Sequence, residues 1–577
     1  MAPSRRRARL SALMALAFAP AAGNAAVLTA MTEVTDYTTA TVMKVEQYTA
    51  SFTMAGGAAA AFSFKTRGYN IADSTISTTT NTLQVGPTFH ASAGDTMKIT
   101  LDNDMPANPT VEATTMNTLH SPMSTNLHTH GLHISSNDPQ DDVYVTVAPG
   151  GTNAYEYSIA SDHMGGTHWY HAHFHGNTAL QVGNGLVGMI IIEDADDEIP
   201  DDLAALSELA LMVQYFEPFE VQKIAKSFPT IEEWTAESGI TDESSYWTVN
   251  GQITPTATVT QNQWTRVRVA YSSLADAATI DLVDTNSLGC EWKLVAKDGI
   301  YVDNAPRTLT TAHVSPGNRF DFVVKCTSAG DFTLTVTAAA ATKGGGGKGR
   351  KLLQTAETLM TFTVNASAAT AAGDLTVFTA KKPVYLQDVY DATLHGVTHV
   401  EHSLSIKGSE GACYVAFDDE GELYDSKSMG TMNTGEVQAW TLTGNGGHPF
   451  HIHINSFQLG DVVDSTGYYA IGDWHDVFYL PSGVTASKIY FQVDQHTGKA
   501  VLHCHFLEHE DKGCMAYIDI DGTADIRVTG LAASALVTGE VEDTTATGTT
   551  TTTDSAGFKI KSFLSTLAAV ALPAALL

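Results

Sequence analysis

The segment His503-Cys-His-Phe-Leu-Glu-His509 decides how the rest of the chain is interpreted. On an extended strand, successive side chains point to opposite faces, so Cys504 would face one way while His503 and His505 face the other. One thiolate with two imidazoles is the trigonal donor set of a blue-copper electron-transfer site, and soft sulfur favours copper over oxygen-loving ions. The segment therefore predicts a copper-binding β-strand.

Three further histidine-rich segments precede it, and all four share the pattern His-x-His. They are Leu127-His-Thr-His-Gly131, Thr167-His-Trp-Tyr-His-Ala-His-Phe-His-Gly176 and His448-Pro-Phe-His-Ile-His453. Random placement of 22 histidines in 577 residues would give about one such pair, whereas the chain has five. A structural zinc site needs only four ligands, so this surplus of candidates indicates several metal ions.

Between these segments the sequence pattern is typical of β-sandwiches. No long stretch keeps a helical period, and short alternating runs such as Trp264 to Val269 and Arg319 to Val324 are broken by Gly, Pro, Asn and Asp. We therefore expect an all-β protein of stacked antiparallel sandwiches. Helices are expected only in connections, for example over Asp202 to Leu211.

Two breaks divide the body into three predicted domains. An acidic linker runs from Glu193 to Asp202, and a small, polar stretch runs from Ala366 to Asp374. The expected domains are residues 27–195, 203–368 and 374–530, each of about 160 residues.

The two ends suggest a protein that works outside the cell. Four arginines precede the apolar run Leu10 to Ala19, and small residues follow, so residues 1–26 are expected to be a signal peptide. Residues 531–577 form a Thr-rich linker and a hydrophobic tail, which suit a removable glycolipid-anchor signal, with a retained short tail as the alternative. We expect a secreted protein, either free or attached to the outer face of the membrane.

The charge balance and the missing motifs exclude proteins that bind nucleic acids or nucleotides. With 31 basic against 63 acidic residues, the chain carries a formal charge of −32 and has no basic patch for nucleic acid. It also has neither of the glycine-rich motifs that hold nucleotide phosphates. Neither nucleic acid nor a nucleotide is therefore an expected partner.

The four motifs, in this order, resemble those of the multicopper oxidases. The similarity is greatest to the copper-efflux and bilirubin-oxidase branch, through residues 166–176 and through His509-Glu-Asp-Lys-Gly513. The resemblance covers about Val27 to Gly522 and implies three cupredoxin-like Greek-key β-sandwich domains. It also implies four copper ions and an oxidase that couples four one-electron oxidations of a donor to the reduction of O2 to water.

The resemblance also implies a ligand set. A type 1 copper in the third domain would take His448, Cys504 and His509, and a type 2 copper would take His128 and His451. A pair of type 3 coppers would share His130, His171, His173, His453, His503 and His505. Cys504 would pass electrons through the adjacent backbone to His503 and His505. Other histidines match no ligand position; they include His133, His168, His175 and His475.

Reduction of O2 consumes protons, so a carboxylate relay is expected near the copper cluster. By resemblance, Glu510 is the first candidate. Asp141 or Asp142 is the second, and the alternative for all three is an ordinary solvated carboxylate.

Where that branch presents a methionine ten residues after the copper-binding cysteine, this chain has Cys514, followed by Met515. Cys514 could be an unusual axial neighbour, could leave that role to Met515, or could form a disulfide. Of the pairings open to the four spare cysteines, Cys290 with Cys326 is favoured.

The donor is expected to be phenolic or aromatic, as for a laccase, with ferrous or cuprous oxidation as the alternative. No Met-rich insert for cuprous ions is present, and four aspartates follow the third motif where a ferrous-binding site would lie: Asp461, Asp464, Asp473 and Asp476. Solvated turns are the slightly favoured interpretation of these aspartates. A non-catalytic surface protein of the same fold is a remote alternative, since it would have lost copper ligands.

Overall fold

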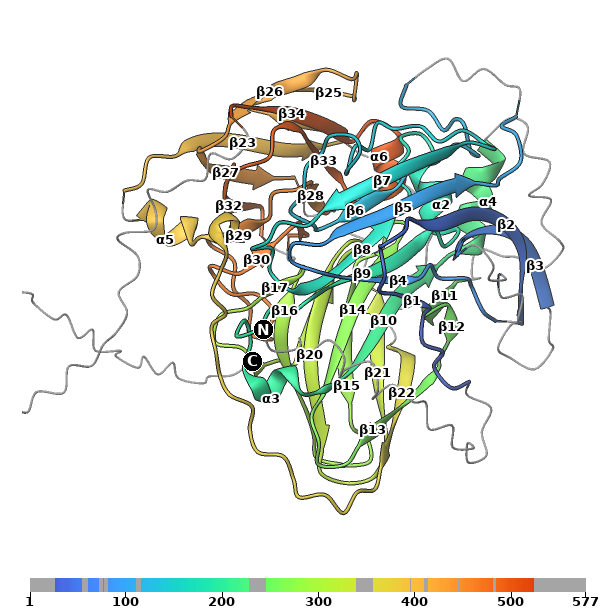
Figure 1. Cartoon of the computed structure of the whole chain (residues 1–577), viewed down its shortest axis with the longest axis vertical. Helices are drawn as coiled ribbons and strands as arrows, with labels where there is room; N and C mark the ends of the chain where they lie inside the picture. Colours follow the sequence, from blue (N-terminus) through green and yellow to red (C-terminus); the bar gives the residue numbers. More distant parts are fainter. Residues whose placement is uncertain are drawn as a thin grey trace, which may run out of the picture. The chain divides into compact units, whose positions relative to one another are not determined.

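The computed structural model describes residues 26–53, 61–71, 76, 81–109, 116–227, 245–338, 356–394, 396–408, 413–444, 447–480 and 484–523. Apart from residue 26, the expected signal peptide lies outside these residues, as does the tail 531–577. Within them, six sheets carry the fold, and each sheet takes all its strands from one of three successive stretches of sequence (Figure 1). The all-β prediction is confirmed.

The first stretch forms two sheets. One has the strand order β1 (Glu33–Val34), β4 (Thr88–Ser92), β9 (Val187–Glu193), β8 (Gly166–His171) and β6 (His128–His130). The other has the order β3 (Ala61–Ile71), β2 (Thr41–Thr53), β5 (Thr96–Asn103) and β7 (Thr152–Ser158). Apolar residues of β4, β5, β7 and β9 form one buried core between them, so the two sheets make a sandwich.

The middle stretch forms a second sandwich. Its larger sheet runs β12 (Gln252–Ile253), β11 (Tyr246–Val249), β10 (Ser207–Phe216), β14 (Thr265–Ser273), β20 (Arg319–Cys326), β16 (Cys290–Lys297) and β17 (Ile300–Tyr301), with β18 (Arg307–Thr308) paired to β16. The facing sheet runs β13 (Thr256–Thr260), β22 (Glu357–Asn365), β21 (Gly330–Ala338), β15 (Ala278–Val283) and β19 (Thr311–Val314).

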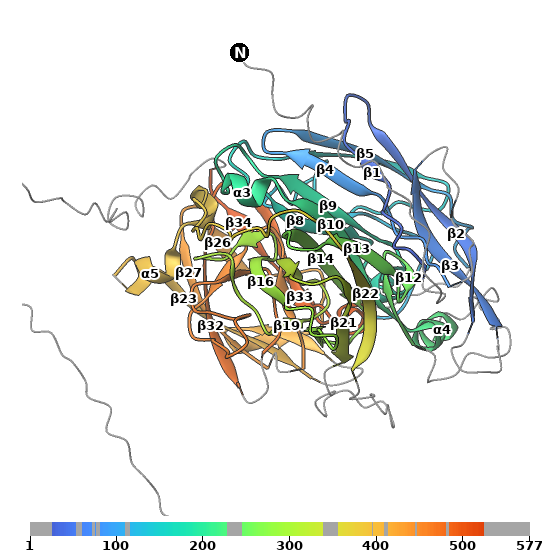
Figure 2. The ribbon, with the colours of Figure 1, turned by 90° about the horizontal axis from the view of Figure 1, so that it is seen from below.

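The last stretch repeats this plan. One sheet runs β25 (Glu420–Glu422), β24 (Tyr414–Phe417), β23 (Val400–Lys407), β27 (Val437–Thr443), β32 (Ala486–Gln492), β29 (Phe457–Leu459) and β30 (Trp474–His475). The other runs β26 (Ser428–Asn433), β34 (Met515–Asp521), β33 (Gly498–Cys504), β28 (Phe450–Ile452) and β31 (Val477–Phe478). In Figure 2 the strands of the first stretch (blue) and of the last (orange to red) lie on opposite sides of the view, with the green middle stretch between them.

The sheets differ from the expectation in being mixed rather than purely antiparallel. In each sandwich a strand from early in its stretch pairs in parallel with a later one, as β2 does with β5, β10 with β14 and β23 with β27. A parallel pair needs a crossover connection instead of a hairpin, and short alternating runs carry no signal for that choice.

The two quoted alternating runs are strands, as predicted. They form β14 and β20, which pair antiparallel, with Val267 opposite Phe322. Alternation commonly leaves the polar face of a strand in water. Here that face is buried too, because Arg266 and Arg268 form ion pairs with Asp321, Asp194 and Glu208.

The expected helix over Asp202 to Leu211 is wrong in its second half. Helix α3 ends at Ala204, and Ser207–Phe216 is strand β10, which lies beside β14 in the sheet. The segment is rich in good helix formers, but pairing with a buried neighbouring strand overrides local propensity.

Helices are short and lie in connections. They are α2 (Thr178–Gly183), α3 (Asp201–Ala204), α4 (Pro218–Ser227), α5 (Val389–Leu394) and α6 (Leu507–Asp511), with the 3-10 turn η2 (Val384–Leu386). Of the helices in the described ranges, none has the length and apolar character needed to cross a bilayer.

Candidate metal centre

Four strands position the histidines. Strand β6 pairs with β8, which places His128 opposite His171, and β28 pairs with β33, which places His451 opposite His503. His128 and His130 both lie on β6 and so share a face. The other three pairs extend past a strand end, because His173, His453 and His505 closely follow β8, β28 and β33. The two strand pairs come from the first and last stretches and lie next to each other in Figure 1.

Eight imidazoles meet where these strand pairs face each other, and we call this group the histidine cluster. It consists of His128, His130, His171, His173, His451, His453, His503 and His505, all buried. Its contacts join the first and last stretches: His173 Nε2 lies 3.3 Å from His503 Nε2, and His130 Nδ1 lies 3.3 Å from His505 Nε2.

Within the cluster, three sets of nitrogens lie close enough to share an ion. In each set the ligand atoms are within 4.8 Å of one another: His130, His171 and His505; His173, His453 and His503; and His128, His130 and His451. All of these residues are metal ligands predicted from the sequence, and the structure brings them together.

The free nitrogens of the cluster fit a metal. Several buried ring nitrogens have no hydrogen-bond partner within the described part of the chain: Nε2 of His128, His171, His451 and His453, and Nδ1 of His505. The opposite nitrogens of His171 and His451 lie 2.9 Å and 2.8 Å from the carbonyls of Ala172 and Asp476. A backbone carbonyl there selects the tautomer whose other nitrogen keeps its lone pair for an ion.

Burial also favours the metal-binding protonation state. It lowers the pKa of every histidine in the cluster, to about 3 for His171 and about 4 for His503. For every cluster member except His503, neighbouring imidazoles lower the pKa further, because two cationic rings would repel each other. Neutral imidazole is the form that binds metal ions, so the cluster suits borderline ions such as copper.

A smaller group, the sulfur–histidine site, consists of Cys504, His448 and His509. Cys504 Sγ lies 3.4 Å from His448 Nδ1 and 3.7 Å from His509 Nδ1. The two Nδ1 atoms are 3.1 Å apart. Cys504 is a free, buried cysteine, whereas His509 is only half-buried, so this site lies nearer the surface than the histidine cluster.

The donor set of this site also fits copper. Burial raises the pKa of the Cys504 thiol, so a bound cation is needed to hold the thiolate there. One thiolate with two imidazoles is the trigonal set that copper prefers.

Of the carboxylates predicted near the cluster, Asp141 and Glu510 reach it. Asp141 Oδ2 lies 2.8 Å from His128 Nδ1, and its Oδ1 accepts the Thr129 N–H at 2.7 Å. Burial raises the pKa of Asp141 to about 7. Glu510 Oε1 lies 3.5 Å from His173 Nδ1. Asp142 instead accepts the backbone N–H of Tyr144, which identifies Asp141 as the aspartate of this pair that contacts the cluster.

The Glu510 side chain is fully buried. Its Oε1 accepts a hydrogen bond from Thr178 Oγ1 at 3.2 Å, and its Oε2 lies 3.7 Å from His503 Nδ1. Burial raises its pKa well above the ordinary value, and the adjacent Asp511 raises it further. Neither Glu510 nor Asp141 is a solvated carboxylate.

The structure gives Asp476 and Asp511 supporting roles that the sequence did not reveal. Asp476 Oδ1 lies 3.2 Å from His130 Nε2, and Arg319 binds both oxygens of this carboxylate. Asp511 accepts the N–H groups of Gly176, Thr178 and Ala179 at the start of α2. These contacts join distant parts of the chain, so no local spacing signals them.

The aspartates after the third motif all have hydrogen-bond or ion-pair partners within the protein. Asp473 and Asp476 are buried, and Asp473 is paired with Lys297 and Arg307. The interpretation as solvated turns is therefore wrong for Asp473 and Asp476, whereas Asp461 is exposed, as that interpretation expects. Asp461 accepts a hydrogen bond from the Lys488 N–H, and Asp464 accepts one from the Thr466 N–H. Both partners belong to the last stretch of the chain.

The histidines without a predicted ligand role lie outside both sites. His133 Nε2 pairs with Asp494 at 3.0 Å, His175 Nε2 lies 3.1 Å from Asn117 Oδ1, and His475 lies between Lys297 and Asp298. His168 is buried, and the centroid of its ring lies 5.6 Å from that of the His163 ring.

The cysteine pairings are resolved. Cys290 is bonded to Cys326, as predicted, across β16 and β20. Cys514 is bonded to Cys413, which selects the disulfide among the three roles considered for Cys514.

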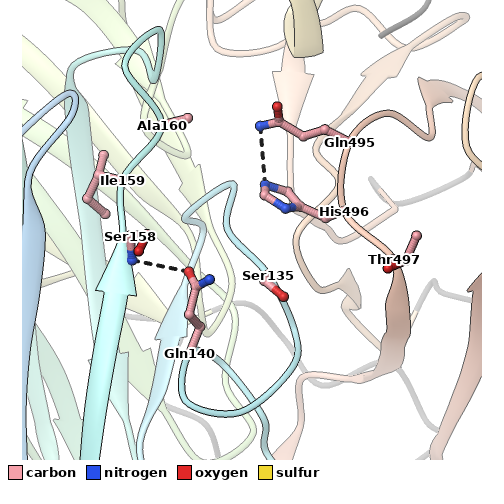
Figure 3. Close-up of a pocket in the computed structure, with 8 residues that line it drawn as sticks. All are labelled: Ser135, Gln140, Ser158, Ile159, Ala160, Gln495, His496 and Thr497. Atoms are coloured by element: carbon pink, nitrogen blue, oxygen red, sulfur yellow. Dashed lines mark hydrogen bonds between the residues drawn. The ribbon is translucent and has the colours of Figure 1, made fainter. Parts of the chain in front are cut away.

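A surface pocket of about 350 Å3 lies between a loop of the first stretch and one of the last. Figure 3 shows Ser135, Gln140 and Ser158 on one side and Gln495, His496 and Thr497 on the other. Gln140 precedes Asp141, but the pocket shares no residue with the histidine cluster or the sulfur–histidine site.

Comparison with known proteins gives consistent matches along the chain. Three multicopper oxidase family models match residues 65–197, 223–359 and 387–522. A multicopper oxidase of Staphylococcus haemolyticus is 25% identical over 444 residues, which cover 76% of this chain and 82% of the relative.

Two solved structures share the fold. A laccase-like multicopper oxidase from Ochrobactrum sp. is 20% identical, with a TM-score of 0.61 over 86% of this chain and 100% of that one. A Campylobacter jejuni multicopper oxidase, described as a metallo-oxidase, is 18% identical, with a TM-score of 0.60 over 87% of this chain and 96% of that one. The three sandwiches are therefore cupredoxin-like.

Proposed function

The chain belongs to the multicopper oxidase family, and on that premise we propose that it is a laccase-like enzyme whose electron donors are phenolic or other aromatic compounds. Family membership makes it a copper-dependent oxidoreductase that uses O2. One observation supports the oxidase chemistry of this proposal: β33 contributes Cys504 to one site and His503 to the other, and His505 follows at its end.

We assign the copper ligands as follows. The sulfur–histidine site holds the type 1 ion, and the sets His130, His171, His505 and His173, His453, His503 hold the type 3 pair. His128 and His451, whose Nε2 atoms have no other partner among the described residues, hold the type 2 ion. Four bound coppers would supply one-electron chemistry and store the four electrons that O2 needs to become two waters.

The protein's part begins with Cys504. Its side chain lies between His448 and His509, while its backbone is bonded directly to His503 and His505. This covalent link connects the site near the surface directly to the buried cluster. Burial of Cys504 and of the histidine cluster keeps bulk water away from this link.

Two carboxylates are proposed to handle protons. Glu510 Oε2 has no hydrogen-bond partner among the described residues and faces His503, so it can hold a proton beside the cluster. Asp141 orients His128 through Nδ1 and has a raised pKa, which suits a second proton-holding group.

The structure favours an organic donor over ferrous ion. The four aspartates that could have bound a metal donor have internal partners, and two of them are buried in ion pairs. Metal oxidation is the second candidate. It is supported by the structural similarity to the Campylobacter jejuni metallo-oxidase and by the net charge of −32, which attracts cations.

We further propose that the enzyme works outside the cell. The two disulfide bonds support this, because disulfides form and persist in oxidising compartments.

Oxygen uptake tests the donor. The copper-loaded protein is given ferrous ion or a bulky phenol at matched concentrations, with Cys504→Ser as the blank. We expect faster uptake with the phenol and none above background in the variant. Faster uptake with ferrous ion would replace the laccase-like proposal with the metal-oxidase one.

A further inference from the structure

One disulfide bond lies against the sulfur–histidine site. Cys413 Sγ is 3.6 Å from His448 Nδ1, and the ligand atoms of Cys413, His448 and His509 lie within 4.8 Å of one another. The same limit holds for His448, Cys504 and Cys514. Both sulfurs of the Cys413–Cys514 bond therefore border the three proposed ligands of the type 1 copper.

The backbone fixes Cys514 in this position. Its N–H donates to the carbonyl of His509 at 2.9 Å, and its own carbonyl accepts the N–H of Cys504 at 3.0 Å. Cys514 is thus tied directly to two of the proposed ligand residues. Cys413 comes from the segment just before β24 and is also buried. The disulfide therefore brings a third segment of the chain to the site, besides those that carry His448 and Cys504.

Met515, the other sulfur residue of this segment, faces elsewhere. It is the register partner of His503, and opposed residues of an antiparallel pair share a face, so Met515 lies on the face opposite to Cys504. It packs in a separate apolar cluster that includes Val501 and Tyr517. With Met515 facing away, the Cys413–Cys514 disulfide is the sulfur group beside the three proposed ligands among the described residues.

We propose that the Cys413–Cys514 disulfide is the weak fourth neighbour of the copper held by His448, Cys504 and His509, and that its oxidised state limits this site to one thiolate. The proposal rests on the proposed type 1 ligands. A disulfide sulfur is neutral and a weak donor, and a weak axial neighbour tunes the redox potential of such a site. Two separate cysteines would instead offer further thiolates, which favour cuprous ion.

Two double variants test this role. Cys413→Ala/Cys514→Ala removes both sulfurs, and Cys413→Ala/Cys514→Met replaces them with a thioether. The matched control is Cys290→Ala/Cys326→Ala, which removes the other disulfide from the middle sandwich. Each protein is loaded with copper and compared by copper content, thiolate-to-copper absorption, electron paramagnetic resonance and potentiometric titration of the type 1 ion.

We expect both site variants to keep the Cys504 absorption band but to change the resonance spectrum. At fixed potential the ratio of oxidised to reduced type 1 copper should change at least tenfold, which equals about 59 mV for one electron. The control should match the parent. Parent-like spectra and potentials in both site variants would overturn the proposal.

Two further measurements separate the possible failures. If Cys504→Ser leaves the parent's absorption band unchanged, the proposed type 1 ligands are wrong, whatever the disulfide does. If the double variants do not fold, a crystal structure of the copper-loaded parent decides. A Cys413 or Cys514 sulfur facing the ion beside the Cys504 thiolate supports the proposal, and its displacement by another side chain refutes it.

Discussion

Asp476 Oδ1 lies 3.2 Å from His130 Nε2, and the same carboxylate binds Arg319, whose Nη1 is 2.7 Å from Oδ1. The arginine belongs to β20 of the middle sandwich, whereas Asp476 and His130 belong to the last and first. All three sandwiches therefore meet at one imidazole. Because Asp476 occupies Nε2, His130 presents Nδ1 to the cluster, the reverse of His171 and His451.

Replacing Asp476 should weaken copper binding at the histidine cluster. Asp476→Asn keeps an oxygen near His130 but removes the charge that Arg319 needs, and loss of such an outer partner typically costs about 10–100-fold in metal affinity. Copper retained during dialysis against graded chelator concentrations measures the effect. The exposed Asp461→Asn is the control and should retain copper like the parent. Equal retention in both variants would show that Asp476 does not orient His130.

Replacing Glu510 should slow O2 reduction without disturbing the type 1 site. Glu510→Gln keeps the size of the side chain but removes a proton-holding carboxyl beside His173 and His503, and proton transfer of this kind contributes about 10²–10⁴-fold in rate. We expect slower reoxidation of the reduced enzyme in rapid mixing, with the Cys504 absorption band unchanged. Glu508→Gln, on the same helix but paired with Lys512 near the surface, should reoxidise normally. Normal reoxidation of Glu510→Gln would rule out the relay.

The candidate ligands were predictable because they repeat at short spacing. His-x-His on a strand places both rings on one face, so His128 with His130 and His503 with His505 are visible in the sequence alone. Pairing across strands then follows from the fold, and it brings His128 opposite His171.

The supporting residues were not predictable for a physical reason. Arg319 and Asp476 are 157 residues apart, and an ion pair at that separation depends on packing rather than on local pattern. The Cys413–Cys514 bond is similar, since spacing alone does not specify a pairing across 101 residues. The strand over Ser207–Phe216 was missed because its partner β14, not its own composition, determines its conformation.

The buried charges between β10, β14 and β20 should be costly to disrupt. Arg266→Met removes the cation that lies 2.7 Å from Asp321 and 3.0 Å from Asp194, so Arg268 alone must serve both buried carboxylates. Because two buried negative charges then share one cation, the loss should approach the cost of breaking a buried pair, about 3–5 kcal/mol. The control is Lys44→Met, whose 3.5 Å pair with Asp104 is largely exposed and worth at most about 1 kcal/mol. Urea unfolding followed by circular dichroism gives the midpoints. A shift for Arg266→Met no larger than that of the control would contradict this account.

Asp298 should make the protein sensitive to acid. Burial would raise the pKa of Asp298, but Arg319 and His475 outweigh it, and the pKa falls from 3.8 to about 2. A carboxyl whose pKa is lower in the folded state stabilises the fold above its unfolded pKa, and this contribution is lost as the pH falls through the folded value. The difference corresponds to about 2 kcal/mol, which should disappear between about pH 4 and pH 2.

The midpoint of urea unfolding, measured across that range, should therefore fall less steeply in Asp298→Asn than in the parent. Asp104→Asn, at the exposed pair with Lys44, should follow the parent. If Asp298→Asn followed the parent as well, the acid sensitivity would have to come from other carboxylates, because the amide cannot gain the proton that Asp298 takes up on unfolding.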